Sequence, residues 1–474
     1  MASGEPPPPT SNGLVVPLVI WGQKPPDNRI TVVRYLCDNT TIVTGALNGQ
    51  VITWKCDEEA LTPCQLMIGH DAPITAISPA NNQASSTRFV TASCDGRLCL
   101  WDIQDGRCVD SISSLYIHRY MQPYTYKSSR HTRSTRLFCI GDYSDIVVVD
   151  PQDLTVVFQL SSRVEPDWIC CYEVVQRTNK SEQCIGISMA GMIKVWSLLE
   201  LEKKDLATPL YEDESKRLEL RDVKSISFNP VNERLLLVVC STNWQLIDLD
   251  DLSVFTVHSC PAKAINGKIL DVDKLAVGYM DHTLRVYQLP LEKLEGAQAR
   301  ERFGATPKNY LGIADPFEFA IWEGSKSSVR SWFNDVAFTF APQRSDQSLF
   351  QSARAMQTGQ LSIWRIPRFD EEVYRKFTSP TQFPLKYRGS FEETLSSVWT
   401  NLSGKDESSL GVQDFGEITC TLFVSSQGKL IMGRSDGLIV MTYACETLSR
   451  QLLNVAMEKQ ATIRQLDGHR GSVR

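Results

Sequence analysis

The chain has 474 residues, of which 42% are hydrophobic and 22% charged, and its formal net charge is −6. This composition is typical of a soluble globular protein, and the negative charge argues against nucleic-acid binding by the chain as a whole. No apolar run approaches the roughly 18 residues of a membrane-spanning helix, and the proline-rich start lacks the layout of a signal peptide. We therefore expect a cytoplasmic location.

The fourteen cysteines are spread along the chain, many of them within apolar runs, as at Cys139, Cys170, Cys171, Cys184 and Cys240. A thiol packs there as a small hydrophobic group, so we expect these cysteines to be reduced and buried. The chain has no CxxC pair, and its six histidines are scattered. The sequence therefore predicts neither a metal site nor a cofactor.

The first segments are an arm and a lone strand. Residues 1–13 are rich in proline, serine and glycine and are predicted to be disordered. The apolar run Leu14–Trp21 is predicted to be a strand that precedes the first full repeat. In a closed ring of sheets, such a strand can complete the last sheet, because closure removes unpaired edges.

Eight similar units follow, each consisting of an apolar run, a tight polar turn and a second apolar run. They span 41–54, 88–102, 136–150, 183–196, 235–248, 274–287, 349–364 and 429–443. A unit of this size cannot bury its own faces, whereas stacked units can. We predict an all-β propeller of seven or more four-stranded blades over residues 14–466. Either the ring has more than seven blades, or one of the eight units belongs to a second propeller.

The second unit is the most complete. Gly69-His70 precedes it, Asp95-Gly96 forms its turn, and it ends at Trp101-Asp102. This pattern resembles the WD-repeat family, and the resemblance implies a structural hydrogen-bond chain through His70, Asp95, Trp101 and a strand hydroxyl of Thr91 or Ser93. In this chain the carboxylate of Asp95 would accept from the imidazole, and the indole would bond at the far end. Other units lack parts of the signature, so we expect less regular blades there.

Three segments interrupt the strand pattern with helix-like sequence, as insertions near 291–312, 367–380 and 390–412. The third opens with the capping box Ser390-x-x-Glu393, and Leu395, Val398 and Trp399 follow at helical spacing. These apolar residues either pack on their own blade or form a helix that docks on a partner. At the end of the chain, residues 467–474 contain Gly468-His469 and are predicted to begin a further repeat, which suggests a truncated form or a fragment.

A stretch without acidic residues runs from 111 to 141. Its basic residues are Arg119, Lys127, Arg130, Arg133 and Arg136, and tyrosines are interleaved with them. Three interpretations remain open: a solvated loop whose tyrosines pack on the blade edge, a patch for acidic proteins or acidic membranes, and a surface for nucleic acid. The first is favoured, and nucleic acid is the least favoured.

Two further motifs favour structural interpretations. The charged run at 211–222 is typical of a solvated connection. Residues 433–437 match the G-x-S-x-G motif of serine hydrolases, but that chemistry needs a strand-to-helix turn, and an apolar strand-like run follows here. We therefore predict no catalytic residues and no enzymatic activity.

Several longer strings resemble the N-terminal region of the rabconnectin-3 beta family. They include VIWGQKPPDNRI, IVTGALNGQVITW, GRLCLWDIQDGRC and the final LDGHRGSV, and they follow in order over most of the chain. The resemblance implies a scaffold that is peripheral on vesicle or endolysosomal membranes. It also implies an alpha-subunit partner, proton ATPase subunits, Rab regulators, and a role in proton ATPase assembly, vesicle acidification and synaptic vesicle trafficking. The alternative is a substrate adaptor of a ubiquitin ligase that reads short peptides.

Overall fold

The computed structural model describes residues 29–289, with gaps at 58–60, 68, 105, 128–132, 179 and 230–231. Beyond residue 316 it describes 317–323, 336–342, 348–356, 359–367, 391–394, 418–424, 429–443 except 436, and 464–467.

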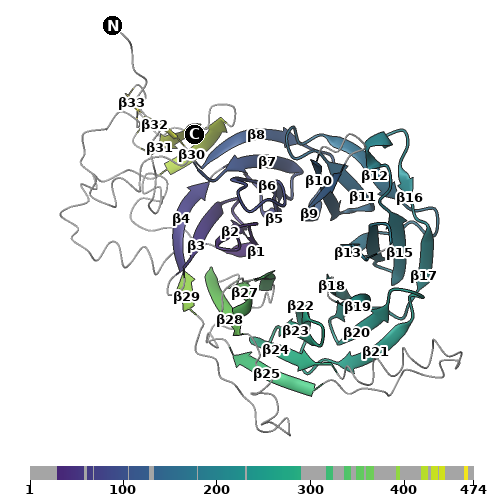
Figure 1. Ribbon diagram of the computed structural model, residues 1–474. Coiled ribbons are helices and arrows are strands. Elements are labelled where there is room, and N and C mark those ends of the chain that lie inside the picture. Colours follow the sequence, from purple (N-terminus) through teal and green to yellow (C-terminus); the bar gives the residue numbers. More distant parts are fainter. Residues whose placement is uncertain are drawn as a thin grey trace, which may run out of the picture.

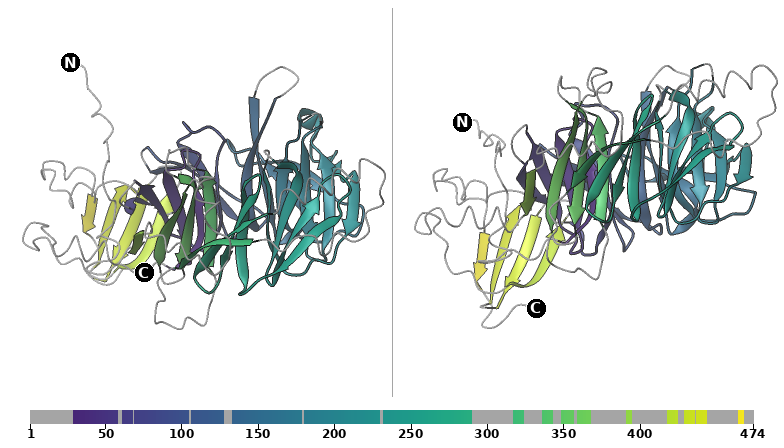
Figure 2. Two further views of the ribbon diagram at one scale, coloured as in Figure 1. Left: turned by 60° about the horizontal axis from the view of Figure 1, so that its bottom comes forward. Right: turned by 90° about the horizontal axis from the view of Figure 1, so that it is seen from below.

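Seven sheets stand around a central channel, and an eighth sheet lies outside the ring (Figures 1 and 2). Each sheet of the ring is a blade whose strands follow one another from the channel outward. The fold is therefore the predicted all-β propeller, with seven blades. The eighth repeat unit does not enlarge the ring but forms the separate sheet.

The first four blades are formed by residues 30–217. Blade 1 contains β1 (Ile30–Tyr35), β2 (Thr41–Ala46), β3 (Val51–Cys56) and β4 (Leu61–Met67). Blade 2 contains β5 (Ile74–Pro79), β6 (Arg88–Ser93), β7 (Arg97–Asp102) and β8 (Arg107–Ser113). Blade 3 contains β9 (His118–Lys127), β10 (Arg133–Gly141), β11 (Tyr143–Val149) and β12 (Val156–Ser161). Blade 4 contains β13 (Ile169–Val175), β14 (Gln183–Ser188), β15 (Met192–Ser197) and β17 (Glu214–Arg217).

The remaining sheets follow the same order. Blade 5 contains β18 (Val223–Asn229), β19 (Asn232–Cys240), β20 (Asn243–Asp248) and β21 (Val254–Ser259). Blade 6 contains β22 (Ala264–Asp271), β23 (Lys274–Tyr279), β24 (Thr283–Gln288) and β25 (Phe317–Glu323), and blade 7 contains β26 (Val336–Pro342), β27 (Ser348–Met356), β28 (Gln360–Pro367) and β29 (Phe391–Thr394). The outside sheet contains β30 (Ile418–Val424), β31 (Lys429–Arg434), β32 (Leu438–Tyr443) and β33 (Arg464–Asp467).

The middle strands of the blades are buried on both faces. In β2 and β14 the five residues after the first are all buried, and Leu236, Leu237 and Val238 in β19 have no exposed surface. A strand that is covered on both sides reads as a continuous apolar run rather than as an alternating one. Neighbouring blades supply this cover, as where residues of blades 4 and 5 share one apolar cluster.

The junctions between blades also carry hydrogen bonds from side chains to backbone carbonyls. Most inner strands have a β-bulge near their first residue, and the bulged residues of blades 1 and 2 are Thr31 and Thr75. The hydroxyl of Thr31 lies 2.6 Å from the carbonyl oxygen of Ile74, and the hydroxyl of Thr75 lies 2.6 Å from that of His118. Each bulged threonine therefore donates to the inner strand of the next blade.

The ring closes between blade 7 and blade 1. Strand β1 packs against β26 and β27, and the guanidinium of Arg365 in β28 donates to the carbonyl of Asp57 at 2.7 Å. The predicted closing strand, Leu14–Trp21, lies outside the described residues. Among the described strands, closure depends on packing and hydrogen bonds between complete blades.

An additional strand ties blades 3 and 4 together. After β15 the chain passes through the short 3₁₀-helix η1 (Leu201–Lys203) and forms β16 (Leu210–Tyr211), which pairs in parallel with β12 of blade 3. The chain then returns to blade 4 as β17. The prediction that the charged run at 211–222 is a solvated connection is thus partly wrong, because part of the run forms β17. An outer strand with one face to solvent can also carry alternating charges.

One predicted helix is partly wrong. The residues Phe391–Thr394, inside the helix-like insertion expected near 390–412, form β29 and pair with β28. Pairing with an existing sheet edge outweighs the weak helical preference of four residues. The rest of that segment, with Leu395, Val398 and Trp399, lies outside the described residues. The same holds for the insertion near 291–312, for residues 368–380 of the other insertion, and for the arm 1–13.

Replacing the bulged threonine of blade 2, Thr75→Val, should lower the free energy of unfolding by about 1–2 kcal/mol, because it removes the donor to the carbonyl of His118. The matched control is Thr155→Val, whose exposed hydroxyl bonds only to Asp153 in its own turn and should cost less than about 0.5 kcal/mol. Urea denaturation measures both. Equal losses for the two variants would contradict the role of Thr75 at the junction.

Candidate functional site: the His70 face and the central channel

The two faces of the ring differ in the connections that form them. Because successive strands are antiparallel, the turns between second and third strands lie on the same face as the connections between blades. This face carries His70, Asp95, Leu115, Trp168 and Met189, and we call it the His70 face. The opposite face carries the remaining turns and loops.

The structure brings the five WD-signature side chains of blade 2 into one buried chain. The indole nitrogen of Trp101 donates to the hydroxyl of Thr91 at 2.7 Å, and Nε2 of His70 lies 2.6 Å from the same hydroxyl. Nδ1 of His70 lies 2.7 Å from the hydroxyl of Ser93, which donates to Asp95 at 2.6 Å. All except Asp95 are nearly or fully buried.

The expected role of Asp95 needs a correction. We expected its carboxylate to accept directly from the imidazole, but the hydroxyl of Ser93 lies between them. Both strand hydroxyls, Thr91 and Ser93, take part, rather than one of the two. Thr91 and Ser93 are two residues apart in β6, so their side chains lie on the same side of the strand. Each hydroxyl can therefore reach one ring nitrogen of His70.

Burial determines the protonation state of His70 in this hydrogen-bond chain. Desolvation lowers the pKa of His70 to about 3, so the ring is neutral near pH 7. The bond from Ser93 and the backbone N–H of Arg97 help to hold the pKa of Asp95 below its ordinary value, against the effect of burial. A neutral imidazole between two hydroxyls holds the blade together and is not a reactive group.

Other blades keep only parts of this arrangement. In blade 1 the indole of Trp54 donates to the hydroxyl of Thr44 at 2.9 Å, which reproduces the Trp101–Thr91 bond. In blade 4 the indole of Trp196 donates instead to the carbonyl of Ser161 in blade 3, at 2.9 Å.

Exposed apolar side chains gather on the His70 face, chiefly at blade 4. Trp168 is 49% exposed in the connection before β13, and Met189 is 65% exposed in the turn after β14. The backbone N–H of Met189 donates to the carbonyl of Trp168 at 2.8 Å. The carboxylate of Asp167 accepts from the N–H groups of Trp168 and Ala190 at 2.8 and 2.7 Å. These bonds hold the backbone of the connection and the backbone of the turn against each other, so little backbone ordering is left to occur on binding.

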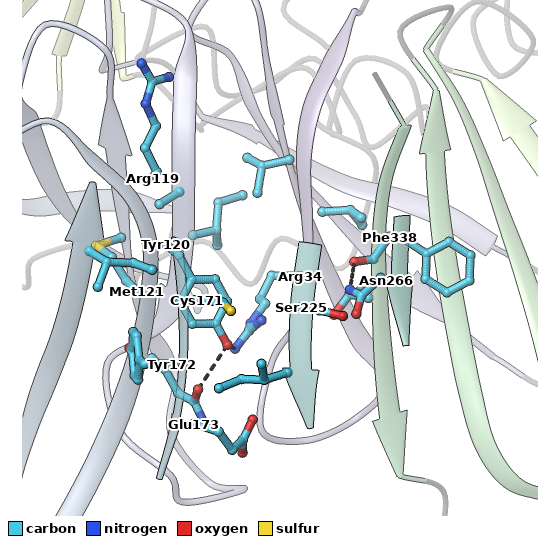
Figure 3. A pocket seen from close by; sticks show the side chains of 18 of the residues that line it. Arg34, Arg119, Tyr120, Met121, Cys171, Tyr172, Glu173, Ser225, Asn266 and Phe338 are labelled. Atoms are coloured by element: carbon cyan, nitrogen blue, oxygen red, sulfur yellow. Dashed lines mark hydrogen bonds between the residues drawn. The ribbon is translucent and has the colours of Figure 1, made fainter. Parts of the chain in front are cut away.

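The inner strands of all seven blades line the central channel, a cavity of about 760 Å³ (Figure 3). Trp168 and Met189 belong to the lining from a connection and a turn on the His70 face, whereas Arg34, Tyr120 and Glu173 lie within the inner strands β1, β9 and β13 (Figure 3). The channel was not predicted, because its lining residues come from seven separate strands and form no local motif.

The predicted basic patch does not form one surface. Arg119 and Lys127 lie near opposite ends of β9, about 26 Å apart at the usual rise per residue. Arg119 forms an ion pair with Asp142 at 2.8 Å, and Arg136 forms one with Asp150 at 2.9 Å. The stretch lacks acids in sequence, but the fold supplies them from the residues directly before and directly after β11.

The other residues of that stretch are placed as follows. Arg133 is exposed at the start of β10, where its backbone pairs with that of Lys127, and Arg130 lies outside the described residues. Three of the tyrosines, Tyr120, Tyr124 and Tyr126, pack in the apolar cluster of blades 3 and 4. These three rings are therefore not free to stack on bases.

The serine-hydrolase motif has a structural explanation. The G-x-S-x-G segment turns from β31 into another strand, β32, without the helix that a hydrolase needs. Among the described residues no group of three or more histidine, cysteine, aspartate or glutamate side chains could hold a metal ion. The described cysteines are free thiols, and the described part of the chain contains no helix that could span a membrane.

Comparisons with known proteins agree with this fold. Residues 61–102, which include β4 and most of blade 2, match the family model "WD domain, G-beta repeat". These findings support the WD40-repeat family. The fold is an all-β, seven-bladed WD40 propeller, a type of domain that is typically a non-enzymatic scaffold for protein partners.

Among curated proteins, the chain is 26% identical to "WD repeat-containing protein 72" of Homo sapiens over 448 residues, which are 92% of the chain and 40% of that protein. It is 27% identical to the Mus musculus protein of the same name over 93% of the chain and 40% of that protein. The chain thus spans about two fifths of the length of these relatives.

Solved structures that resemble the chain include the C-terminal WD40 domain of Sif2, with a TM-score of 0.44 and 16% identity over 71% of the chain and 79% of the domain. The β-propeller domain of Myceliophteria thermophila Cps50 (Swd1) has a TM-score of 0.47 and 13% identity over 71% of the chain and 97% of the domain.

The free energy of unfolding should fall as the pH is lowered. The unfolded chain binds a proton at His70 below about pH 6.5, whereas the folded chain does so only near pH 3, so between these values the unfolded state binds more protons. When the pH is lowered from about 7 to about 5, the titration of His70 alone should reduce the free energy of unfolding by about 2 kcal/mol. His118, whose pKa burial lowers to about 4, acts in the same direction.

Urea denaturation of the wild type and His70→Gln at both pH values measures this effect. The variant should be less stable near pH 7 and should lose less stability on acidification, since it lacks one of the titrating groups. A variant with the full pH dependence of the wild type would contradict the burial of a neutral His70.

Proposed function

We propose that this chain is a non-enzymatic scaffold that binds protein partners through the His70 face. The observation that carries the proposal is the pair Trp168 and Met189, whose backbones are joined by a hydrogen bond and whose side chains are about half or more exposed beside the channel. Tryptophan in a preorganised, partly apolar site is the residue type that most often dominates binding energy at protein interfaces. A partner segment with an apolar side chain fits this chemistry.

We further propose that the scaffold belongs to a rabconnectin-type complex that promotes vacuolar proton ATPase assembly, vesicle acidification and vesicle trafficking. The support for this is the sequence resemblance described above. The proposed location is cytoplasmic, peripheral on vesicle or endolysosomal membranes, and the proposed partners are an alpha-like subunit, proton ATPase subunits and Rab regulators.

Affinity capture with quantitative mass spectrometry tests the face and the partners together. The double variant Trp168→Ser with Met189→Ser should recover at least about tenfold less of the alpha-like subunit and proton ATPase subunits, because truncating interface anchors costs about 2 kcal/mol or more. The matched control is Leu199→Ser with Leu206→Ser, two apolar residues of the connection after β15 that are 58% and 63% exposed. This control should recover the partners at the wild-type level.

Three results would contradict the proposal. Recovery of cullin-type ligase components in place of these subunits would favour the substrate-adaptor alternative. Equal loss in both double variants would show that the His70 face has no special role. Wild-type recovery with the Trp168 and Met189 variant would exclude this pair as the anchor.

A further inference from the structure

The central channel differs in charge from the protein as a whole. The formal net charge of the chain is −6, yet the described residues that line the channel include four basic and two acidic side chains. The basic residues are Arg34, Arg119, Lys224 and Lys268, and the acidic ones are Asp142 and Glu173. A cavity with one sign of charge and low-dielectric walls concentrates ions of the opposite sign.

The two basic residues nearest the His70 face have acidic partners. Arg119 and Lys224 are the bulged residues of β9 and β18. Arg119 binds Asp142 through two nitrogen–oxygen contacts of 3.0 and 2.8 Å, and Lys224 pairs with Asp222 at 2.7 Å. These charges are compensated, so the excess lies deeper in the channel.

The deeper group consists of Arg34 from blade 1, Lys268 from blade 6 and Glu173 from blade 4. The guanidinium of Arg34 donates to the hydroxyl of Tyr120 at 3.3 Å and lies 5.1 Å from the centre of its ring (Figure 3). The hydroxyl of Tyr120 in turn donates to Gln122 at 3.0 Å. Tyr120 thus positions the guanidinium while most of its five N–H donors remain available.

The charges of this deeper group do not cancel. In the described part of the chain, neither Arg34 nor Lys268 forms an ion pair within 4.0 Å, and Glu173 is the one carboxylate of the group. Burial raises the pKa of Glu173, and the positive charges of Lys268 and Arg34 oppose this effect. Two cations with one carboxylate leave a positive charge without a partner in a cavity, which is costly unless an anion or water compensates it.

We propose that the central channel binds a small polyanion, a molecule with several phosphate or carboxylate groups, between Arg34 and Lys268. The cavity volume of about 760 Å³ is within the range of roughly 300–1,000 Å³ that is usual for small-molecule sites. A guanidinium binds two oxygens of such a group at once, and an ammonium adds a point charge. The ligand would contact several blades and stabilise the closed ring.

Isothermal titration calorimetry of the whole chain with two probes tests this site and distinguishes the two sources of charge. Inositol hexakisphosphate supplies phosphates, and citrate supplies carboxylates. We expect saturable binding of at least one probe, weakened by added salt. The probe that binds more tightly identifies the ligand class.

Three variants locate the site. Lys268→Gln should weaken binding at least about tenfold, because it removes one of two cations. Glu173→Gln should tighten binding several-fold, because it removes the competing carboxylate. The matched control Lys263→Gln removes an exposed charge from the His70 face and should bind as the wild type does. Thermal unfolding of each variant, followed by circular dichroism, verifies that it is folded.

The opposite changes in affinity expected for Lys268→Gln and Glu173→Gln distinguish a site in the channel from general electrostatic attraction to the protein surface. Absence of saturable binding for both probes would overturn the proposal. Equal weakening by Lys268→Gln and Lys263→Gln, or weaker binding in Glu173→Gln, would also overturn it. A failure here leaves the proposed role of Trp168 and Met189 intact, because the capture experiment does not use the channel residues.

Discussion

The face-to-face burial of each blade by its neighbours is the constraint on which the rest of this structure depends. A blade with two apolar faces needs cover on both of them, so the seven blades stabilise one another around the closed ring. Hydrogen bonds between side chains and backbone carbonyls of neighbouring blades also fix how the blades are oriented relative to one another. Examples are the donation of Asn266 to the carbonyl of Phe338 between blades 6 and 7, and that of Tyr172 to the carbonyl of Phe138 between blades 4 and 3.

The functional surfaces follow from this arrangement. Because the sheets themselves are covered, binding groups must lie on the turns, on the connections or on the inner strands. Asp167 holds one such connection and one such turn together and thereby presents Trp168 and Met189. The inner strands bring Arg34, Glu173 and Lys268 to one channel although they lie far apart in sequence.

The architecture was predictable from the sequence because each repeat encodes one blade locally. The five WD-signature residues of blade 2 were predictable for the same reason, but the position of the Ser93 hydroxyl between His70 and Asp95 depends on distances that a pattern does not contain. The blade number was not predictable, because the unit at 429–443 has the same pattern as those in the ring and still forms a separate sheet.

A pattern in the sequence does not show which distant residues will become neighbours, and this explains the two clearest differences between prediction and structure. The basic stretch was judged by its own composition, whereas Asp142 and Asp150 pair with Arg119 and Arg136 only after β10 and β11 form a hairpin. The four residues of β29 carry a helical preference in isolation, and the free edge of β28 overrides it. In both cases a non-local partner determines the outcome.

The short parallel pairing of β16 with β12 has a consequence for the dynamics of the ring. The segment between β15 and β17 crosses from blade 4 to blade 3 and returns, so neither blade can separate from the other without first releasing this strap. Blades 3 and 4 should therefore open as one cooperative unit.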